Sequence, residues 1–190
     1  MGDFGSNDQI LSEQAESLVL IGDLDGAKRI AAQLTDRQLL HGLWHSILYR
    51  QFDSGDLQQV KETIGSLSDE FLWMGSWVHD LVLNLAKSGD TDGAMWIVNK
   101  MPGDSPRGHF LMLIASVQAE KDDCVGTEHT LELLQGNKFW RDVALAQVAR
   151  IRKMRGDTDG AHRIATMIND PIIRDVAFRH ISASSTQSDT

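Results

Sequence analysis

The 190-residue sequence lacks several features that would point to particular classes of protein. Its single cysteine, Cys124, can form neither an internal disulfide nor a thiolate metal cage, which favours a reducing compartment. No apolar run approaches the roughly 20 residues that span a bilayer. The first ten residues, MGDFGSNDQI, have neither the basic nor the apolar region of a signal peptide. We therefore expect a soluble, cytoplasmic protein without membrane contact.

The motifs of common catalytic sites are missing as well. The chain has no glycine-rich phosphate loop, no G-x-S-x-G nucleophile turn and no closely spaced cysteine pair. Cys124 has no obvious histidine and acid partner that would make it a nucleophile. We expect no enzymatic activity and no cofactor.

Basic residues are scarce over most of the chain, and the formal net charge is −9. Residues 1–137 hold 9 basic and 21 acidic side chains, whereas residues 138–180 hold 9 basic and 5 acidic ones. An acidic body argues against binding along a phosphate backbone. Any capture of acidic groups is therefore expected near the C-terminal end.

A short motif is repeated three times, as GDLDGA at 22–27 and GDTDGA at 89–94 and 156–161. Two degenerate copies, GDLQQV and DDCVGT, lie between these motifs. Aligning the five turn positions gives spacings of 33, 34, 33 and 34 residues for Gly22, Gly55, Gly89, Asp122 and Gly156. A constant period in this range is typical of stacked helical hairpins.

Each repeat contains two predicted helices, a helix A before the turn and a helix B after it. The turn glycine suits the positive φ that ends a helix, and the following aspartates suit the N-cap of the next helix. Helix B carries apolar residues at i, i+3, i+4 and i+7, with an alanine where the two helices approach closely. A calcium loop is disfavoured, because Asn99 stands where the twelfth, bidentate glutamate would be.

The turn motif and its period resemble the tetratricopeptide repeat family over roughly residues 8 to 182. The family's central G-D-x-x-x-A pattern falls on Gly22/Asp23/Ala27, Gly89/Asp90/Ala94 and Gly156/Asp157/Ala161, and Trp44 stands at its helix A tryptophan position. SGDTDGAMWIVNKMP is also similar to the neighbouring pentatricopeptide family, which binds RNA. The resemblance implies an all-α fold, a right-handed α-solenoid of five helix-turn-helix repeats with a C-terminal capping helix.

The expected domain layout follows from this register. Residues 1–7 and 184–190 are predicted to be disordered. Residues 8–183 form one repeat domain, with units at about 8–40, 41–74, 75–107, 108–141 and 142–174 and a final helix at 172–182.

In the family, the A helices line a concave groove. Carrying the groove positions over by register predicts a peptide-binding surface formed by His45, Tyr49, His79, Leu83, His109, Met112, Arg150 and Lys153. His41 and His45 lie four residues apart, which suits either a metal or pH-sensitive site or simply polar groove side chains; we expect no metal. The RIRKMR run at 150–155 is either a hydrated helix end or a grip for carboxylates.

The leading functional hypothesis is a non-enzymatic protein-binding module, an adaptor, scaffold, assembly factor or chaperone, that holds a peptide or helix of another protein in this groove. The C-terminal end of the groove would favour an acidic partner. The alternative is single-stranded RNA binding in the pentatricopeptide manner, which the acidic body disfavours. Self-association through tryptophan-rich faces, giving a homo-oligomer, is a further alternative.

Overall fold

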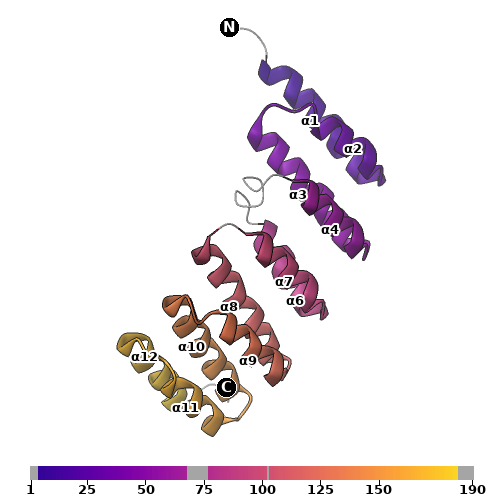
Figure 1. Ribbon diagram of the computed structural model, residues 1–190. Helices are drawn as coiled ribbons and strands as arrows, with labels where there is room; N and C mark the ends of the chain where they lie inside the picture. The colour runs from indigo at the N-terminus through magenta and orange to yellow at the C-terminus, as the bar shows by residue number, and fades with distance from the viewer. Residues whose placement is uncertain (1–3, 68–76, 102, 184–190) are drawn as a thin grey trace, which may run out of the picture. The chain divides into compact units, whose positions relative to one another are not determined.

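The computed structural model describes residues 4–67, 77–101 and 103–183 (Figure 1). These residues form α-helices and no strand, which confirms the all-α prediction. The expected tail at 184–190 and the expected boundary between the second and third repeats at 74/75 lie outside the described residues. The chain divides into two units, residues 1–81 and 82–190. No helix in the described ranges is long and apolar enough to cross a membrane.

The first unit contains α1 (Phe4–Ile21), α2 (Leu24–Ala31), α3 (Arg37–Asp53), α4 (Leu57–Ser66) and the start of α6 (Trp77–Ser88). Helix α1 begins at Phe4, inside the stretch 1–7 that we expected to be disordered. Helix α1 packs on α2 and α3, and α3 packs on α4. The core of the first three helices consists of Ala15, Val19, Ala27, Ala31, Leu34, Leu43 and Ile47.

The second unit contains the end of α6 and then α7 (Thr91–Lys100), α8 (Asp104–Glu120), α9 (Cys124–Leu133), α10 (Lys138–Met154), α11 (Thr158–Thr166) and α12 (Pro171–Ser182). Helix α10 packs on α8, α11 and α12, and α8 packs on α9 (Figure 1). Helix α12 covers the residues expected for the final helix. Its core with α10 and α11 includes Leu145, Ala149, Ala161, Ala165, Ile168, Ala177 and Ile181.

One compact turn joins the helices within each hairpin. Gly22 has φ 86° and ends α1, and the Asp23 amide donates to the Leu18 carbonyl, which completes a Schellman motif. The Asp23 carboxylate then accepts a hydrogen bond from the Gly26 amide at 2.8 Å, so Asp23 is also the N-cap of α2. The first aspartate of the motif is likewise the cap in the other turns, at Asp56, Asp90, Asp123 and Asp157. This confirms the capping interpretation.

The second glycine of each motif is explained by the same cap. A Cβ built at Gly93 or Gly160 would collide with the capping carboxylate of Asp90 or Asp157. The alanine that follows is fully buried at Ala27, Ala94 and Ala161, where helix B meets the rest of its hairpin. The D-G-A end of the motif therefore follows from close packing at the start of helix B.

Asp122 occupies the turn position that glycine holds elsewhere. Its φ is 63°, a conformation that costs a non-glycine residue about 1 kcal/mol. Asp122 also forms an exposed ion pair with Arg155 at 3.6 Å, which contributes little. We predict that Asp122→Gly raises the free energy of unfolding by roughly 0.5–1 kcal/mol, measured as a shift in the urea midpoint. A loss of stability would show that the ion pair outweighs the backbone strain.

The second and fourth hairpins share a buried glutamine and a buried threonine. Each of these residues lies 67 positions from its counterpart in the other hairpin. In the fourth hairpin the Thr130 hydroxyl donates to Gln118 Oε1 at 2.8 Å, and both side chains are buried. Gln51 and Thr63 hold the same positions in the second hairpin and are also buried. Gln51 donates instead to Gln59 at 3.1 Å. The second and fourth hairpins thus share these two buried positions but differ in the hydrogen bonds that they form.

Two buried aspartates tie a helix A to the loop that leads into the next one. Asp8 accepts hydrogen bonds from the Thr35 amide and hydroxyl and from the Asp36 amide, at the start of α3. Asp142 accepts from the backbone amides of Asn169 and Asp170, at the start of α12. The two positions are equivalent when the five turns are aligned. These contacts fix the spacing of neighbouring A helices.

The Asp8 contacts predict a pH dependence of stability. The hydrogen bond from the Thr35 side chain and that from the Asp36 backbone hold the pKa of Asp8 below its ordinary 3.8, although burial opposes them. A depressed folded-state pKa stabilises the fold above the unfolded-state value, and this stabilisation is lost as the pH falls through the folded-state value. The difference in urea midpoint between the wild type and Asp8→Asn should therefore be larger at neutral pH than in acid below 3.8. An unchanged difference would contradict this role.

Candidate binding surface

In the basic run 150–155, Arg152 and Arg155 contact residues of the turns, whereas Arg150 does not. Arg152 donates to the Asp157 carboxylate at 3.0 Å and to Cys124 Sγ at 3.1 Å. The hydrogen bond with Arg152 is the largest cause that lowers the pKa of Asp157, and Asp157 in turn raises the pKa of Arg152. Arg155 donates to the Glu120 carbonyl and pairs with Asp122. These two arginines connect neighbouring turns.

Lys153 and Arg150 contact different neighbours, although both were predicted to line the groove. Lys153 Nζ lies 3.4 Å from Thr158 Oγ1, in the first turn of α11. Its register position matches that of Ala119, which is buried in α8. Arg150 is exposed and matches the half-buried Ser116. The two side chains therefore do not form one row of cations.

Arg150 has no carboxylate partner among the described residues. Its Nε donates to Gln147 Oε1 at 3.1 Å, and Nη1 lies 3.4 Å from Met154 Sδ. The guanidinium borders an open hollow of about 420 Å³. This hollow is lined by Glu120, Arg150, Ile151, Met154 and Arg155. Arg150 is thus the cation of the run that stays available to an incoming anion.

The other predicted groove residues are distributed along the A helices. His45 and Tyr49 lie together on α3 with ring centroids 6.3 Å apart. His79 and Leu83 are half-buried on α6, as are His109 and Met112 on α8. The His109 ring packs edge-on against Trp140 at 5.1 Å. In the described part of the chain, no three histidine, cysteine or acidic residues are grouped to hold a metal ion.

His45 influences His41, which lies one turn away on the same helix. Partial burial, and after it the charge of His45, lowers the pKa of His41. His41 is half-buried at the register position of Asp8 and Asp142, whereas His45 is exposed. Since the two residues are four positions apart on one helix, they lie on the same side of α3 and differ only in exposure.

An apolar surface that sequence reasoning missed lies on α10 and α12. Phe139 is 61% exposed, and Ile172, at the same register position one repeat later, is 74% exposed. Val143 and Val176 follow them by one turn on their helices, and Val176 is 39% exposed. Helices α10 and α12 pack directly on each other, so the shared register places these two pairs on adjacent helices. We call Phe139, Val143, Ile172 and Val176 the apolar patch.

The apolar patch and Arg150 belong to one stripe of α10. Phe139, Val143, Ala146, Arg150 and Met154 recur at i, i+4, i+7, i+11 and i+15, which places them on one helix face. The buried residues Leu145, Val148 and Ala149 lie on the other side, toward α8, α11 and α12. Met154 is 74% exposed at the far end of the stripe. One face of the second unit thus offers apolar contacts at one end, and at the other a cation beside the exposed Met154.

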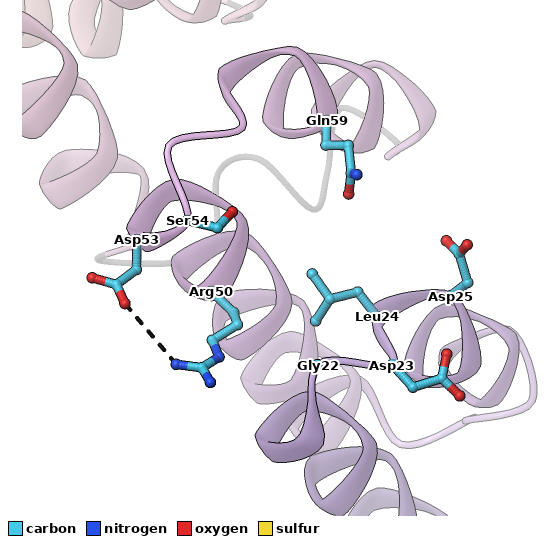
Figure 2. Close-up of a pocket in the computed structure, with 8 residues that line it drawn as sticks. All are labelled: Gly22, Asp23, Leu24, Asp25, Arg50, Asp53, Ser54 and Gln59. Atoms are coloured by element: carbon cyan, nitrogen blue, oxygen red, sulfur yellow. Dashed lines mark ion pairs between the residues drawn. The ribbon is translucent and has the colours of Figure 1, made fainter.

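A second hollow, of about 530 Å³, lies in the first unit between the turns of its two hairpins (Figure 2). It is lined by Gly22, Asp23, Leu24, Asp25, Arg50, Asp53, Ser54 and Gln59. Figure 2 shows Arg50 directed toward Asp53, and the two charges are 4.0 Å apart. Asp23 serves as the cap of α2. Asp23 and Arg50 therefore already have partners within the chain.

Comparison with protein-family models, with curated proteins and with solved structures finds no match for this chain.

Proposed function

We propose that the protein is a non-enzymatic interaction module that binds a segment of another polypeptide on the exposed face of its A helices. The observation that carries this proposal is the apolar patch on α10 and α12. Large apolar side chains scattered singly on a surface need no explanation, but the exposed Phe139, Ile172 and Val176 lie in register on adjacent helices, beside the half-buried Val143, and offer a contact surface.

The proposal also includes the arrangement of the hairpins. The chain forms a right-handed α-solenoid of five tetratricopeptide-like hairpins closed by α12, and its A helices line the binding side. Support comes from the repeated Schellman turns, from the repeated N-caps and from the packing of α8, α10 and α12 in sequence order. A stack of this kind is ordered before binding, so little conformational entropy is lost by the receptor.

The test is the recovery of partner proteins from cells with the tagged chain and its variants. Phe139→Ser combined with Ile172→Ser removes the two most exposed apolar side chains of the patch. We expect the double variant to lower affinity roughly 100-fold, since burying each side chain contributes about 1.5 kcal/mol or more. The specific partner should disappear from the recovered proteins.

Val125→Ser is the matched control. Val125 is 79% exposed and lies on α9, a B helix away from the proposed face. This variant should recover the same partner as the wild type. Loss of the partner with Val125→Ser, or its retention with the double variant, would place binding on another surface.

A further inference from the structure

The stripe on α10 places two kinds of contact at a defined separation. Arg150 follows Phe139 by 11 residues on the same helix face, which corresponds to about 16 Å along the axis. Ala146 lies between them and offers only a small side chain. A ligand that spans the stripe from Phe139 to Arg150 is therefore apolar at one end and complementary to a guanidinium at the other.

The positive charge of Arg150 determines which chemical group of the ligand suits this end of the stripe. Its contacts in the described structure are a neutral amide oxygen and a thioether sulfur, and neither neutralises the guanidinium. Arg152 and Arg155, by contrast, already have the carboxylates of Asp157 and Asp122. A carboxylate on the ligand can form the bidentate, charge-assisted hydrogen bonds that arginine favours.

We propose that the partner segment is an amphipathic α-helix that lies along α10 and α12. It places apolar side chains, one turn apart, on Phe139, Val143, Ile172 and Val176, and it directs an Asp or Glu carboxylate at Arg150. This proposal rests on the proposed function and specifies the chemistry of its partner.

The spacing favours a helix, because the four patch residues form two levels separated by one helical turn. A helix packed along α10 has the same rise of about 1.5 Å per residue, so its own i and i+4 side chains meet both levels. Its acidic side chain then falls two to three turns further along the same face, at i+7 to i+11. The hollow beside Arg150 has room for that carboxylate.

The experiment uses a displayed library of 16-residue helical peptides, selected on the full chain and counter-selected on the Ile172→Ser variant. We expect enriched peptides with apolar residues at i and i+4 and an acidic residue at i+7 to i+11. Enriched peptides without the acidic position, or without helical spacing, would overturn the helix proposal. If no peptide prefers the wild type over Ile172→Ser, the proposed face itself is wrong, and the proposed function fails with it.

A charge exchange then tests the contact with Arg150. For a selected peptide, Arg150→Glu should weaken binding at least about tenfold, and replacing the peptide's acidic residue with lysine should restore affinity to the Arg150→Glu variant. Lys138→Glu is the matched control, because Lys138 is an exposed cation at the other end of α10. Equal losses for Arg150→Glu and Lys138→Glu, or no restoration by the exchange, would leave the apolar contact in place but refute the carboxylate contact.

Discussion

Asp142→Ala is expected to lower the free energy of unfolding by about 3 kcal/mol, the largest effect among the single changes considered. Asp142 is 2% exposed, and its carboxylate accepts hydrogen bonds from the backbone amides of Asn169 and Asp170 at 3.1 and 2.8 Å. Alanine cannot accept these hydrogen bonds, and the amides would remain without partners in the loop before α12. The loss should appear as a lower urea midpoint in circular dichroism.

Asp175→Ala is the matched control for this prediction. Asp175 holds the same register position in α12, but it is exposed and forms only a surface ion pair with Arg179 at 2.8 Å. Its replacement should change the free energy of unfolding by less than about 1 kcal/mol. Similar losses at the two positions would show that the loop contacts of Asp142 do not stabilise the fold.

The second large loss of stability is expected for Gly108→Ala. Gly108 is buried in α8, and a Cβ there would fall within 3 Å of three atoms of Trp140, at the start of α10. Moving the indole would disturb its contacts with His109 and Phe139. We expect a loss of about 2 kcal/mol, typical of overpacking in a close contact.

Gly42→Ala should instead raise the free energy of unfolding. Gly42 lies inside α3, is exposed, and has no atom within 4 Å of an added Cβ. Alanine has the higher helix propensity, so the variant should gain up to about 1 kcal/mol. Thermal unfolding of the two variants in parallel measures both effects. Stabilisation by Gly108→Ala would mean that Trp140 repacks at no cost.

The helices and turns could be predicted from the sequence because their causes are local. The helix A and helix B stripes repeat at 3.6-residue spacing, and a glycine at positive φ followed by a capping aspartate needs no distant partner. Gly22, Gly89 and Gly156 illustrate this, since each turn is completed by residues within five positions. The period of 33 or 34 residues then indicates which helices are equivalent.

The contacts between repeats could not be predicted in the same way. Asp8 and Asp142 bind amides 27 or 28 residues away, and two aspartates in a chain rich in them give no signal by themselves. The roles of Arg152 and Arg155 likewise depend on which turns are neighbours. A comparison of register positions could have found the apolar patch, because Phe139 and Ile172 stand at the same position and are both large and apolar.

The most direct test of the proposed binding face is photo-crosslinking in cells. A photoreactive phenylalanine analogue placed at Ile172 reports on the face of α12, and the same analogue at Val125 reports on α9. Proposed binding on the A helices predicts a covalent adduct with one specific polypeptide from position 172 and none with that polypeptide from position 125. Adducts with that polypeptide from position 125 alone would contradict it.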